Sequence, residues 1–220
     1  MKFLVIVPAY NEGDEIASVI SKIKDCGHDL VVVDDGSIDN TVLAARSAGA
    51  KVLTHLLNRG QGASLRTGIQ YAKGMGYQAV VFFDADGQMM ASDISRLVVS
   101  MEKDNLDVVL GSRFIGRVEN IPTAKLFTLK LALLFTRIIT GLKLTDVHNG
   151  FQAWKMTALD RTNLIQDRQA YASEVLQNIA DLKLKYCEVG VTIRYTKYSI
   201  SKGQSILNAF NIIWDLIVKK

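Results

Sequence analysis

Short apolar runs alternate with segments of helical periodicity through the first half of the chain. The segments between the runs are expected to form helices at about 15–24, 40–48, 63–73 and 91–103. Strands that alternate with helices form βαβ units, which build a mostly parallel sheet covered by helices on both faces. The sequence therefore predicts an α/β fold with a mostly parallel central sheet, whose strands are FLVIV (3–7), LVVVDD (30–35), KVLTH (51–55), AVVFFD (79–84) and DVVLGSR (107–113).

Chain length and charge limit the possible classes of protein. A chain of 220 residues that is 49% hydrophobic can bury one full core. The net charge of only +4, without a polybasic tail, argues against nucleic-acid binding. Cys26 and Cys187 show no CxxC spacing or disulfide framework, which suits a reducing compartment. The first apolar run is broken by Pro8, so it is interpreted as a strand and not as a signal peptide.

Polar motifs follow four of the five predicted strands. They are PAYNE after the first, DDGSID after the second, DADGQ after the fourth and GSR at the end of the fifth. In open α/β sheets, ligands bind beyond the carboxyl ends of the strands. Four polar motifs at one edge of the sheet therefore predict a binding site there.

The stretch VVFFDADGQMM (80–90) predicts a metal site. Asp84, Asp86 and Gln88 are spaced by two, so in an extended segment their side chains would lie on one side. Carboxylate and amide oxygens suit Mg²⁺ or Mn²⁺, whereas the 3 histidines are scattered and do not indicate zinc. A general acid and base, or a solvated turn, would also place two carboxylates here.

The first two strand ends offer groups that could hold a nucleoside. In PAYNE, Pro8 and Tyr10 could shape a pocket for a base, and Glu12 could accept a hydrogen bond from a polar edge. In VVVDDGSIDNT (31–41), Asp34 and Asp35 could bind a ribose or a base.

Taken together, these motifs resemble the family 2 glycosyltransferases of the GT-A (Rossmann-like) fold. PAYNE, VVVDDGSIDNT, NRGQGASLRTGI (58–69), FFDADGQ and GSRF follow in the order and spacing of that family, and the resemblance covers essentially the whole chain. The group that the chain resembles most is the polyprenyl-phosphate sugar transferases, such as dolichol-phosphate mannose synthase. This resemblance implies an inverting, metal-dependent transfer from a nucleotide-diphosphate sugar to the phosphate of a membrane polyprenol.

The resemblance also implies roles for individual residues. Asp86 and Gln88 would be the protein ligands of Mg²⁺ or Mn²⁺, and Asp84, Asp86, Arg113 and Asp146 would form the catalytic set. The residues that would hold the nucleotide sugar or the phosphates are Pro8, Tyr10, Glu12, Val33, Asp35, Asp84, Ala85, Asp86, Lys125 and Lys202.

Two further positions bear on this resemblance. Glu174 matches an acid in a later helix of the family. The chain departs from many relatives in having Ile206 after the Ser of SKGQS (201–205), where they carry a lysine. That departure leaves Lys202 and Lys197 to neutralise the leaving group.

Two segments of the second half, about 125–143 and 205–220, are apolar except for narrow polar stripes, and basic residues flank both. Neither has the ~20 uninterrupted apolar residues that a bilayer span requires. Helices that lie in a membrane interface have this pattern, although core packing would also bury an apolar helix.

We expect one domain, 1–220, with a nucleotide-sugar and metal-binding half at 1–115 and an acceptor half at 116–220. It would lie at the cytoplasmic face of a membrane, attached directly or through a small integral membrane partner.

Other functions remain as alternatives. The chain could extend a lipid-linked saccharide in cell-surface polysaccharide synthesis. A sugar hydroxyl would then be the acceptor and would need a base, for which Asp146 is the best candidate. A nucleotidyltransferase usually has a Gly-rich segment after its first strand, and here no glycine occurs before Gly13. A non-catalytic nucleotide-sugar-binding subunit is disfavoured because the DAD, Gln88 and GSR groups are all present.

Overall fold

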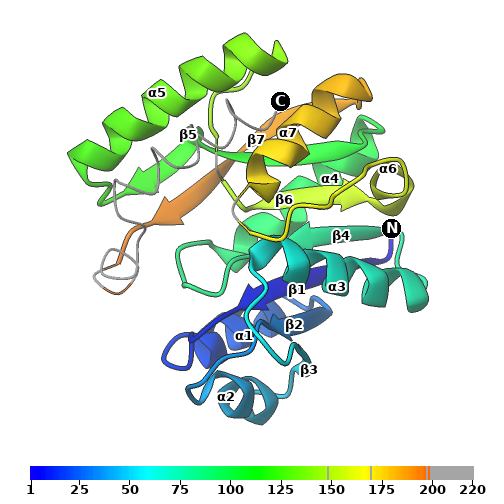
Figure 1. The fold of residues 1–220 in the computed structure, drawn as a ribbon, viewed down its shortest axis with the longest axis vertical. Helices are drawn as coiled ribbons and strands as arrows, with labels where there is room; N and C mark the ends of the chain where they lie inside the picture. The colour runs from blue at the N-terminus through cyan, green and yellow to red at the C-terminus, as the bar shows by residue number, and fades with distance from the viewer. Residues whose placement is uncertain (148, 169, 197, 199–220) are drawn as a thin grey trace.

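The computed structural model describes residues 1–147, 149–168, 170–196 and 198 (Figure 1). In this part of the chain, seven strands form one sheet in the order β3-β2-β1-β4-β6-β5-β7. All neighbouring strands are parallel except for the two pairs that β6 makes, with β4 and with β5. The predicted mostly parallel sheet is therefore confirmed. Its strands are β1 (Phe3–Ala9), β2 (Leu30–Asp34), β3 (Lys51–Thr54), β4 (Ala79–Phe82), β5 (Val108–Glu119), β6 (Gln152–Lys155) and β7 (Tyr186–Arg194).

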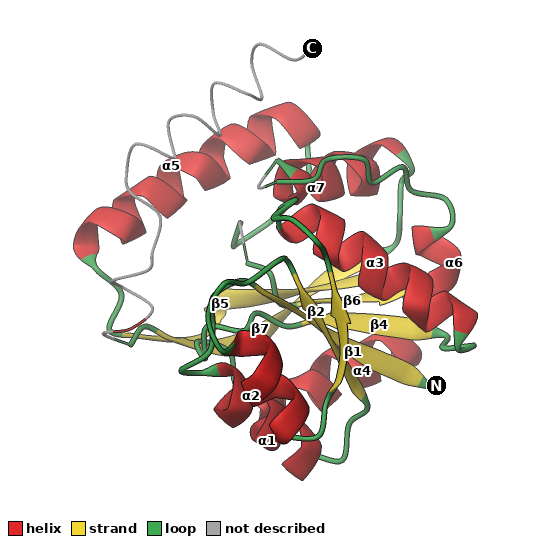
Figure 2. Ribbon diagram, turned by 60° about the horizontal axis from the view of Figure 1, so that its bottom comes forward, coloured by secondary structure: helices red, strands yellow, loops and turns green. Residues whose placement is uncertain are grey.

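Helices cover both faces of the sheet (Figure 2). On one face lie α1 (Ile16–Asp25), α2 (Thr41–Ser47) and α4 (Ile94–Lys103), with the short 3-10 helix η1 (Ala91–Asp93) before α4. On the other lie α3 (Gln61–Gly74), α6 (Met156–Leu159) and α7 (Tyr171–Asp181). The long helix α5 (Thr123–Thr140) stands apart from the sheet beyond β5 and β7 (Figure 1).

Burial on both faces explains the continuous apolar runs of the central strands. In β1, Val5 and Val7 pack toward α1 and α4, and Leu4 and Ile6 pack toward α3. All four side chains are at most 2% exposed. A strand with side chains buried on both faces loses the polar alternation of a half-exposed strand, and this is the pattern of the first half of the sequence.

Several element bounds differ from the sequence-based expectation. β4 ends at Phe82, before Asp84, whereas β5 continues past the GSR motif to Glu119. β6, β7, α6 and α7 were not predicted. The four-residue β6 lies antiparallel between two strands of the parallel series, and neither its length nor its position follows from βαβ alternation. The predicted helix at 205–220 lies outside the described residues.

Candidate active site

Asp84 and Asp86 lie in a turn after β4 and not on an extended strand. The N–H of Gln88 donates a hydrogen bond to Oδ1 of Asp86 at 3.0 Å, as in Asx-type turns. Gly87 has a φ of +73°, a left-handed conformation that glycine adopts at little cost. The expected period-two array is therefore wrong in its backbone geometry. The turn nonetheless places both carboxylates at the carboxyl edge of the sheet.

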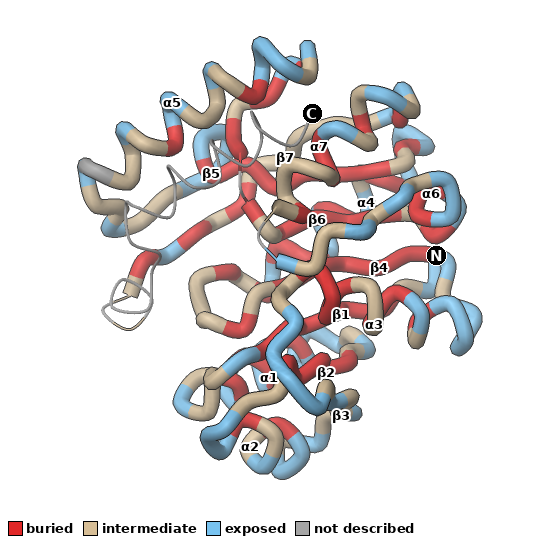
Figure 3. Tube along the Cα trace, viewed as in Figure 1, coloured by how far each residue is buried: buried red, intermediate tan, exposed pale blue. Residues whose placement is uncertain are grey.

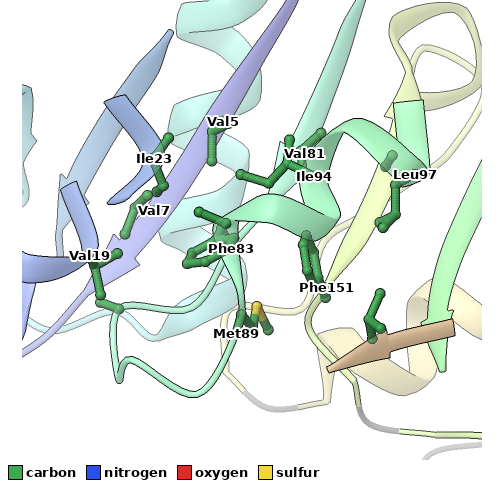
Figure 4. Close-up of a cluster of buried hydrophobic side chains, with 14 of the residues drawn as sticks. Val5, Val7, Val19, Ile23, Val81, Phe83, Met89, Ile94, Leu97 and Phe151 are labelled. Atoms are coloured by element: carbon green, nitrogen blue, oxygen red, sulfur yellow. The ribbon is translucent and has the colours of Figure 1, made fainter. Parts of the chain in front are cut away.

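Apolar side chains on both sides anchor this turn to the core. Phe83 and Met89 belong to the cluster between the sheet and helices α1 and α4 (Figure 4). The ring of Phe83 meets that of Phe151 edge to face, with centroids 5.3 Å apart. The sulfur of Met89 accepts the N–H of Asp84 at 3.3 Å. Anchoring of this kind holds the carboxylates in place before a ligand binds.

The two carboxylates carry negative charge that the protein only partly compensates. Burial and the neighbouring Asp86 raise the pKa of Asp84 to about 7, and burial and Glu12 raise that of Asp86 to about 6. One hydrogen bond relieves Asp84, from Nε2 of Gln61 to Oδ1 at 2.8 Å. A Cβ at Gly150 would lie 2.6 Å from Oδ2 of Asp84, so a larger residue there would displace this carboxylate.

This donor set fits a hard divalent cation. Among the described residues no three His, Cys, Asp or Glu side chains are grouped as metal ligands. The candidate protein ligands are therefore Asp84, Asp86 and the predicted amide of Gln88. Mg²⁺ usually takes one or two carboxylates and completes its shell with water and phosphate oxygens. Burial is the main cause of both raised pKa values and repulsion between carboxylates adds to it, and a cation here would offset both effects.

A β-bulge directs Arg113 into the site. The pairing of β5 with β7 shifts register between Ser112 and Arg117, which removes Arg113 from the ladder. The backbone N–H of Arg113 instead donates a hydrogen bond to Oδ2 of Asp146 at 2.9 Å, and Nε of Arg113 donates to the same oxygen at 2.7 Å. Burial disfavours the charged guanidinium, but the carboxylate of Asp146 outweighs that effect and raises the pKa of Arg113.

Two more side chains complete this positively charged corner. Nη1 of Arg113 donates to the hydroxyl of Tyr195 at 2.6 Å, and Nζ of Lys125 lies 5.3 Å from the centre of the Tyr195 ring. Burial and the nearby Arg113 both lower the pKa of Lys125, while Asp86 raises it. Arg113 and Lys125, predicted as phosphate-binding residues, thus lie together beside the acidic turn.

Asp146 is fully engaged within the protein. Its Oδ2 accepts hydrogen bonds from Arg113 and, at 3.2 Å, from Nδ2 of Asn149, while Oδ1 accepts the N–H of Val147 at 2.8 Å. The side chain is 1% exposed. The structure therefore places Asp146 as the buried partner of Arg113 and does not support its expected availability as a base.

Asp34, the last residue of β2, and Asp35, which follows it, have different hydrogen-bond partners. The carboxylate of Asp35 accepts the backbone N–H of Gly60 at 2.6 Å and of Arg59 at 3.0 Å, and Nδ1 of His55 lies 2.7 Å from it. Asp35 therefore holds loop 58–60 at the start of α3. Oδ1 of Asp34, by contrast, is buried without a hydrogen-bond partner among the described residues. A buried acceptor in that state needs a donor from water or a ligand.

The other predicted donor-side residues are placed as follows. Tyr10 is 44% exposed at the end of β1, and Glu12 accepts the hydroxyl of Tyr198 at 2.7 Å. Val33 and Ala85 are buried in the core, so only their main chain could contact a ligand. Pro8 is buried at the end of β1, and Lys197 and Lys202 lie outside the described residues.

The carboxylate of Glu174 bonds the protein's own backbone. Its two carboxylate oxygens accept the N–H groups of Ile165 and Gln166 at 2.9 and 3.1 Å. This carboxylate ties the 165–166 loop to α7.

Sequence reasoning missed two residues of the site, Gln61 and Tyr195, and a third, Glu188, whose carboxylate accepts the N–H of Asp146 at 3.0 Å. Gln61 stands inside the NRGQG motif, so that motif was the available signal. Tyr195 follows β7, a strand that was not predicted, and Glu188 lies within it. No local pattern connects these last two with Arg113, because their proximity arises from the pairing of β5 with β7.

Comparison with known proteins agrees with this geometry. Residues 4–162 match the model of the family described as Glycosyl transferase family 2. The chain is 31% identical to the UDP-N-acetylglucosamine–dolichyl-phosphate N-acetylglucosaminyltransferase of Methanococcus voltae, over 98% of this chain and 95% of that one. It is 27% identical to an undecaprenyl-phosphate mannosyltransferase of Micrococcus luteus, over 100% and 96%.

A solved structure shows the same fold. Glucosyl-3-phosphoglycerate synthase from Mycobacterium tuberculosis, in complex with Mn²⁺ and uridine-diphosphate-glucose, superposes with a TM-score of 0.72. The two share 19% identity, over 98% of this chain and 76% of that one.

Proposed function

Since this chain belongs to glycosyl transferase family 2, we propose that it transfers a sugar, with inversion, from a nucleotide-diphosphate sugar to a polyprenyl phosphate. The observation that carries this proposal is that two cations, Arg113 and Lys125, lie together at the site, while the neighbouring acid, Asp146, is engaged by Arg113 and Asn149. A phosphate acceptor is already anionic near neutral pH and needs no base. The relatives named for dolichyl-phosphate and undecaprenyl-phosphate transfer support the same acceptor class.

The chain's residues would act mainly by positioning and by electrostatics. Arg113 and Lys125 would hold the acceptor phosphate, one oxygen of which attacks the anomeric carbon from the side opposite the leaving group. The nucleoside diphosphate then departs with the electron pair of the broken bond, and this single displacement inverts the configuration. A bound Mg²⁺ or Mn²⁺, held by Asp86, Gln88 and Asp84, would supply Lewis-acid stabilisation of that leaving group.

Metal binding is expected to stabilise the fold more at high pH than at low pH. Because both aspartates have raised pKa values, the stability that they contribute is fully present below about pH 4 and is lost as the pH rises through about 6 to 7. A cation binds only the ionised forms. In thermal unfolding, Mn²⁺ should raise the Tm roughly twice as much at pH 8 as at pH 5.5. An equal rise at both pH values would contradict the metal site.

Helix α5 supports attachment to a membrane, because many of its residues are exposed (Figure 3) and several of the exposed ones are apolar. Leu129 and Thr136 face the protein and are buried, so the predicted polar stripe is partly directed inward. The exposed apolar side chains are Phe127, Leu131, Leu134, Ile138 and Ile139. Within the described residues no helix has the length and hydropathy of a transmembrane span. We propose that α5 lies in the interface of the cytoplasmic face of a membrane, where a lipid acceptor is presented.

The double change Phe127→Asp and Ile138→Asp should release the protein from vesicles that contain phosphatidylglycerol. The two side chains are 72% and 74% exposed, so the fold does not depend on burying them. In a bilayer each would contribute about 1.5–3 kcal/mol. Flotation measures the loss, and Val99→Asp is the matched control, since Val99 is 58% exposed on α4. Equal release by the control, or no release by the double variant, would exclude this surface.

A donor and acceptor screen tests the proposed reaction. The protein is incubated with single nucleotide sugars and Mn²⁺ or Mg²⁺, and release of nucleoside diphosphate is measured with a polyprenyl phosphate, with a lipid-linked sugar, or with neither. Release that depends on the polyprenyl phosphate supports the proposal. Release only with the lipid-linked sugar supports a hydroxyl acceptor. The absence of release from every donor with either acceptor would point to a non-catalytic binding subunit.

A further inference from the structure

We propose that Glu188 is a positioning residue for the acceptor phosphate, because it holds the turn through which Asp146 fixes the guanidinium of Arg113. The inference rests on the proposed phosphate acceptor, which Arg113 would contact. Glu188 itself lies in β7 and pairs in register with Leu110 of β5.

The carboxylate of Glu188 grips the backbone of one turn. The N–H of Thr145 points at both oxygens, at 2.9 Å from Oε1 and 2.7 Å from Oε2, and the N–H of Asp146 donates to Oε1 at 3.0 Å. A hydrogen bond of 2.7 Å between the hydroxyls of Ser112 and Thr145 joins the same turn to β5. Side-chain hydrogen bonds thus fix the turn to both β5 and β7.

The position of this turn determines where Asp146 can meet Arg113. The N–H of Asp146 bonds Glu188 while its Oδ2 bonds the N–H and Nε of Arg113. Asp146 therefore links Glu188 of β7 to the guanidinium of Arg113 through hydrogen bonds at both its main chain and its side chain. Arg113 lies at the bulge, where its own backbone has left the β5 ladder. Its orientation accordingly depends on Asp146 more than it would within a regular strand.

A carboxylate is the group that this position requires. Two backbone N–H groups converge on it, and only an acceptor-only side chain can satisfy both without presenting a donor. Glutamine would keep the shape, and its one oxygen could accept both N–H groups, but its NH₂ group would face the N–H of Thr145, which lies 2.7 Å from Oε2 in Glu188. The 145–146 turn would then move away, and Asp146 would move with it. Burial raises the pKa of Glu188, so a neutral isostere relieves a desolvation cost and the variant should still fold.

The test compares Glu188→Gln with Asp107→Asn. Asp107 is the matched control because its carboxylate also accepts a backbone N–H, that of Lys185 at 2.9 Å. Both residues directly precede their strands, so this contact lies at the amino ends of β5 and β7. For both variants we would titrate farnesyl phosphate, as a short polyprenyl phosphate, and UDP and GDP with Mn²⁺. A ¹H–¹⁵N spectrum would follow the Nε–H signal of Arg113, assigned by its absence in Arg113→Lys.

In Glu188→Gln the affinity for farnesyl phosphate should fall about tenfold or more, the affinity for the nucleotide should stay within about twofold, and the Arg113 Nε–H signal should shift or broaden. Asp107→Asn should change none of the three. If Glu188→Gln has the wild-type affinity for farnesyl phosphate and the wild-type Arg113 Nε–H signal, the proposal is overturned. A variant that shows a lowered Tm and no other change would overturn it as well.

Two results separate this inference from the proposed function. If wild-type protein binds no farnesyl phosphate and transfers no sugar, the proposed acceptor is wrong, and the Arg113 signal still decides whether Glu188 positions the guanidinium. If Glu188→Gln does not fold, Glu188→Asp replaces it. That variant keeps the charge but is one methylene shorter, and it should cause a partial loss of acceptor affinity with nucleotide affinity unchanged.

Discussion

Replacing Asp86 with alanine is expected to lower kcat by about a thousandfold or more, equivalent to about 4 kcal/mol of transition-state stabilisation. The loss follows from removing a carboxylate that would hold the metal beside the departing diphosphate. The fold should survive, because Asp86 fills no core volume and burial already raises its pKa. The metal-free variant at pH 8 should therefore unfold at the same temperature as wild-type protein or at a higher one.

Two measurements check this prediction together. The rate is measured with Mn²⁺ and a saturating donor, and thermal unfolding is followed with and without the metal. Mn²⁺ should no longer raise the Tm of Asp86→Ala. The control is Asp104→Ala, which removes an exposed acid at the end of α4 and should leave both the rate and the metal response unchanged. Full activity of Asp86→Ala, or of wild-type protein in excess chelator, would show that the metal assignment is wrong.

Replacing Arg113 with methionine is expected to cost about 3–5 kcal/mol of folding stability, because it leaves Asp146 buried with its charge unpaired. Asp146 is 1% exposed and Arg113 is 5% exposed, so water cannot take the place of the lost partner. Changing both residues, to Arg113→Met and Asp146→Asn, should restore part of that stability, because asparagine removes the unpaired charge and keeps an acceptor for the backbone N–H of Arg113. Activity should stay low in both variants, because the cation for the acceptor phosphate is missing.

Denaturant unfolding and acceptor kinetics separate the two effects of Arg113. Arg113→Lys keeps the charge but loses the planar fork, so kcat/KM for the acceptor should fall roughly ten- to a thousandfold, or about 1.4 to 4 kcal/mol. If the double variant recovers stability and transfers sugar at the wild-type rate, Arg113 serves the fold alone. A stability loss that the second change does not repair would contradict the ion-pair account.

The sheet could be predicted because the central strands are buried on both faces. The runs that became β1, β2 and β4 are almost wholly apolar, and the intervening segments have helical periodicity, so the βαβ order follows from local pattern. The antiparallel insertion of β6 between β4 and β5 could not be predicted. QAWK is short and carries no alternation, and its place depends on contacts with strands distant in the sequence.

The candidate site was predictable in its residue types and less so in its geometry. The DADGQ and GSR motifs identify the acids and the arginine, but the turn at Gly87 and the bulge after Ser112 orient them. Bulges and turns of this kind depend on tertiary pairing, which a local sequence pattern does not specify. The same limit applies to Asp146, whose hydrogen bonds to Arg113 bridge 33 positions of sequence.

The most direct test of the proposed reaction is to identify its lipid product. Undecaprenyl phosphate and dolichyl phosphate would be incubated with the protein, Mn²⁺ and a panel of nucleotide sugars, and the lipid fraction analysed by mass spectrometry and NMR. We expect one sugar joined to the polyprenol through its phosphate, with the anomeric configuration inverted relative to the donor. A lipid recovered without a sugar, while sugar is transferred to a hydroxyl acceptor under the same conditions, would contradict the proposed function.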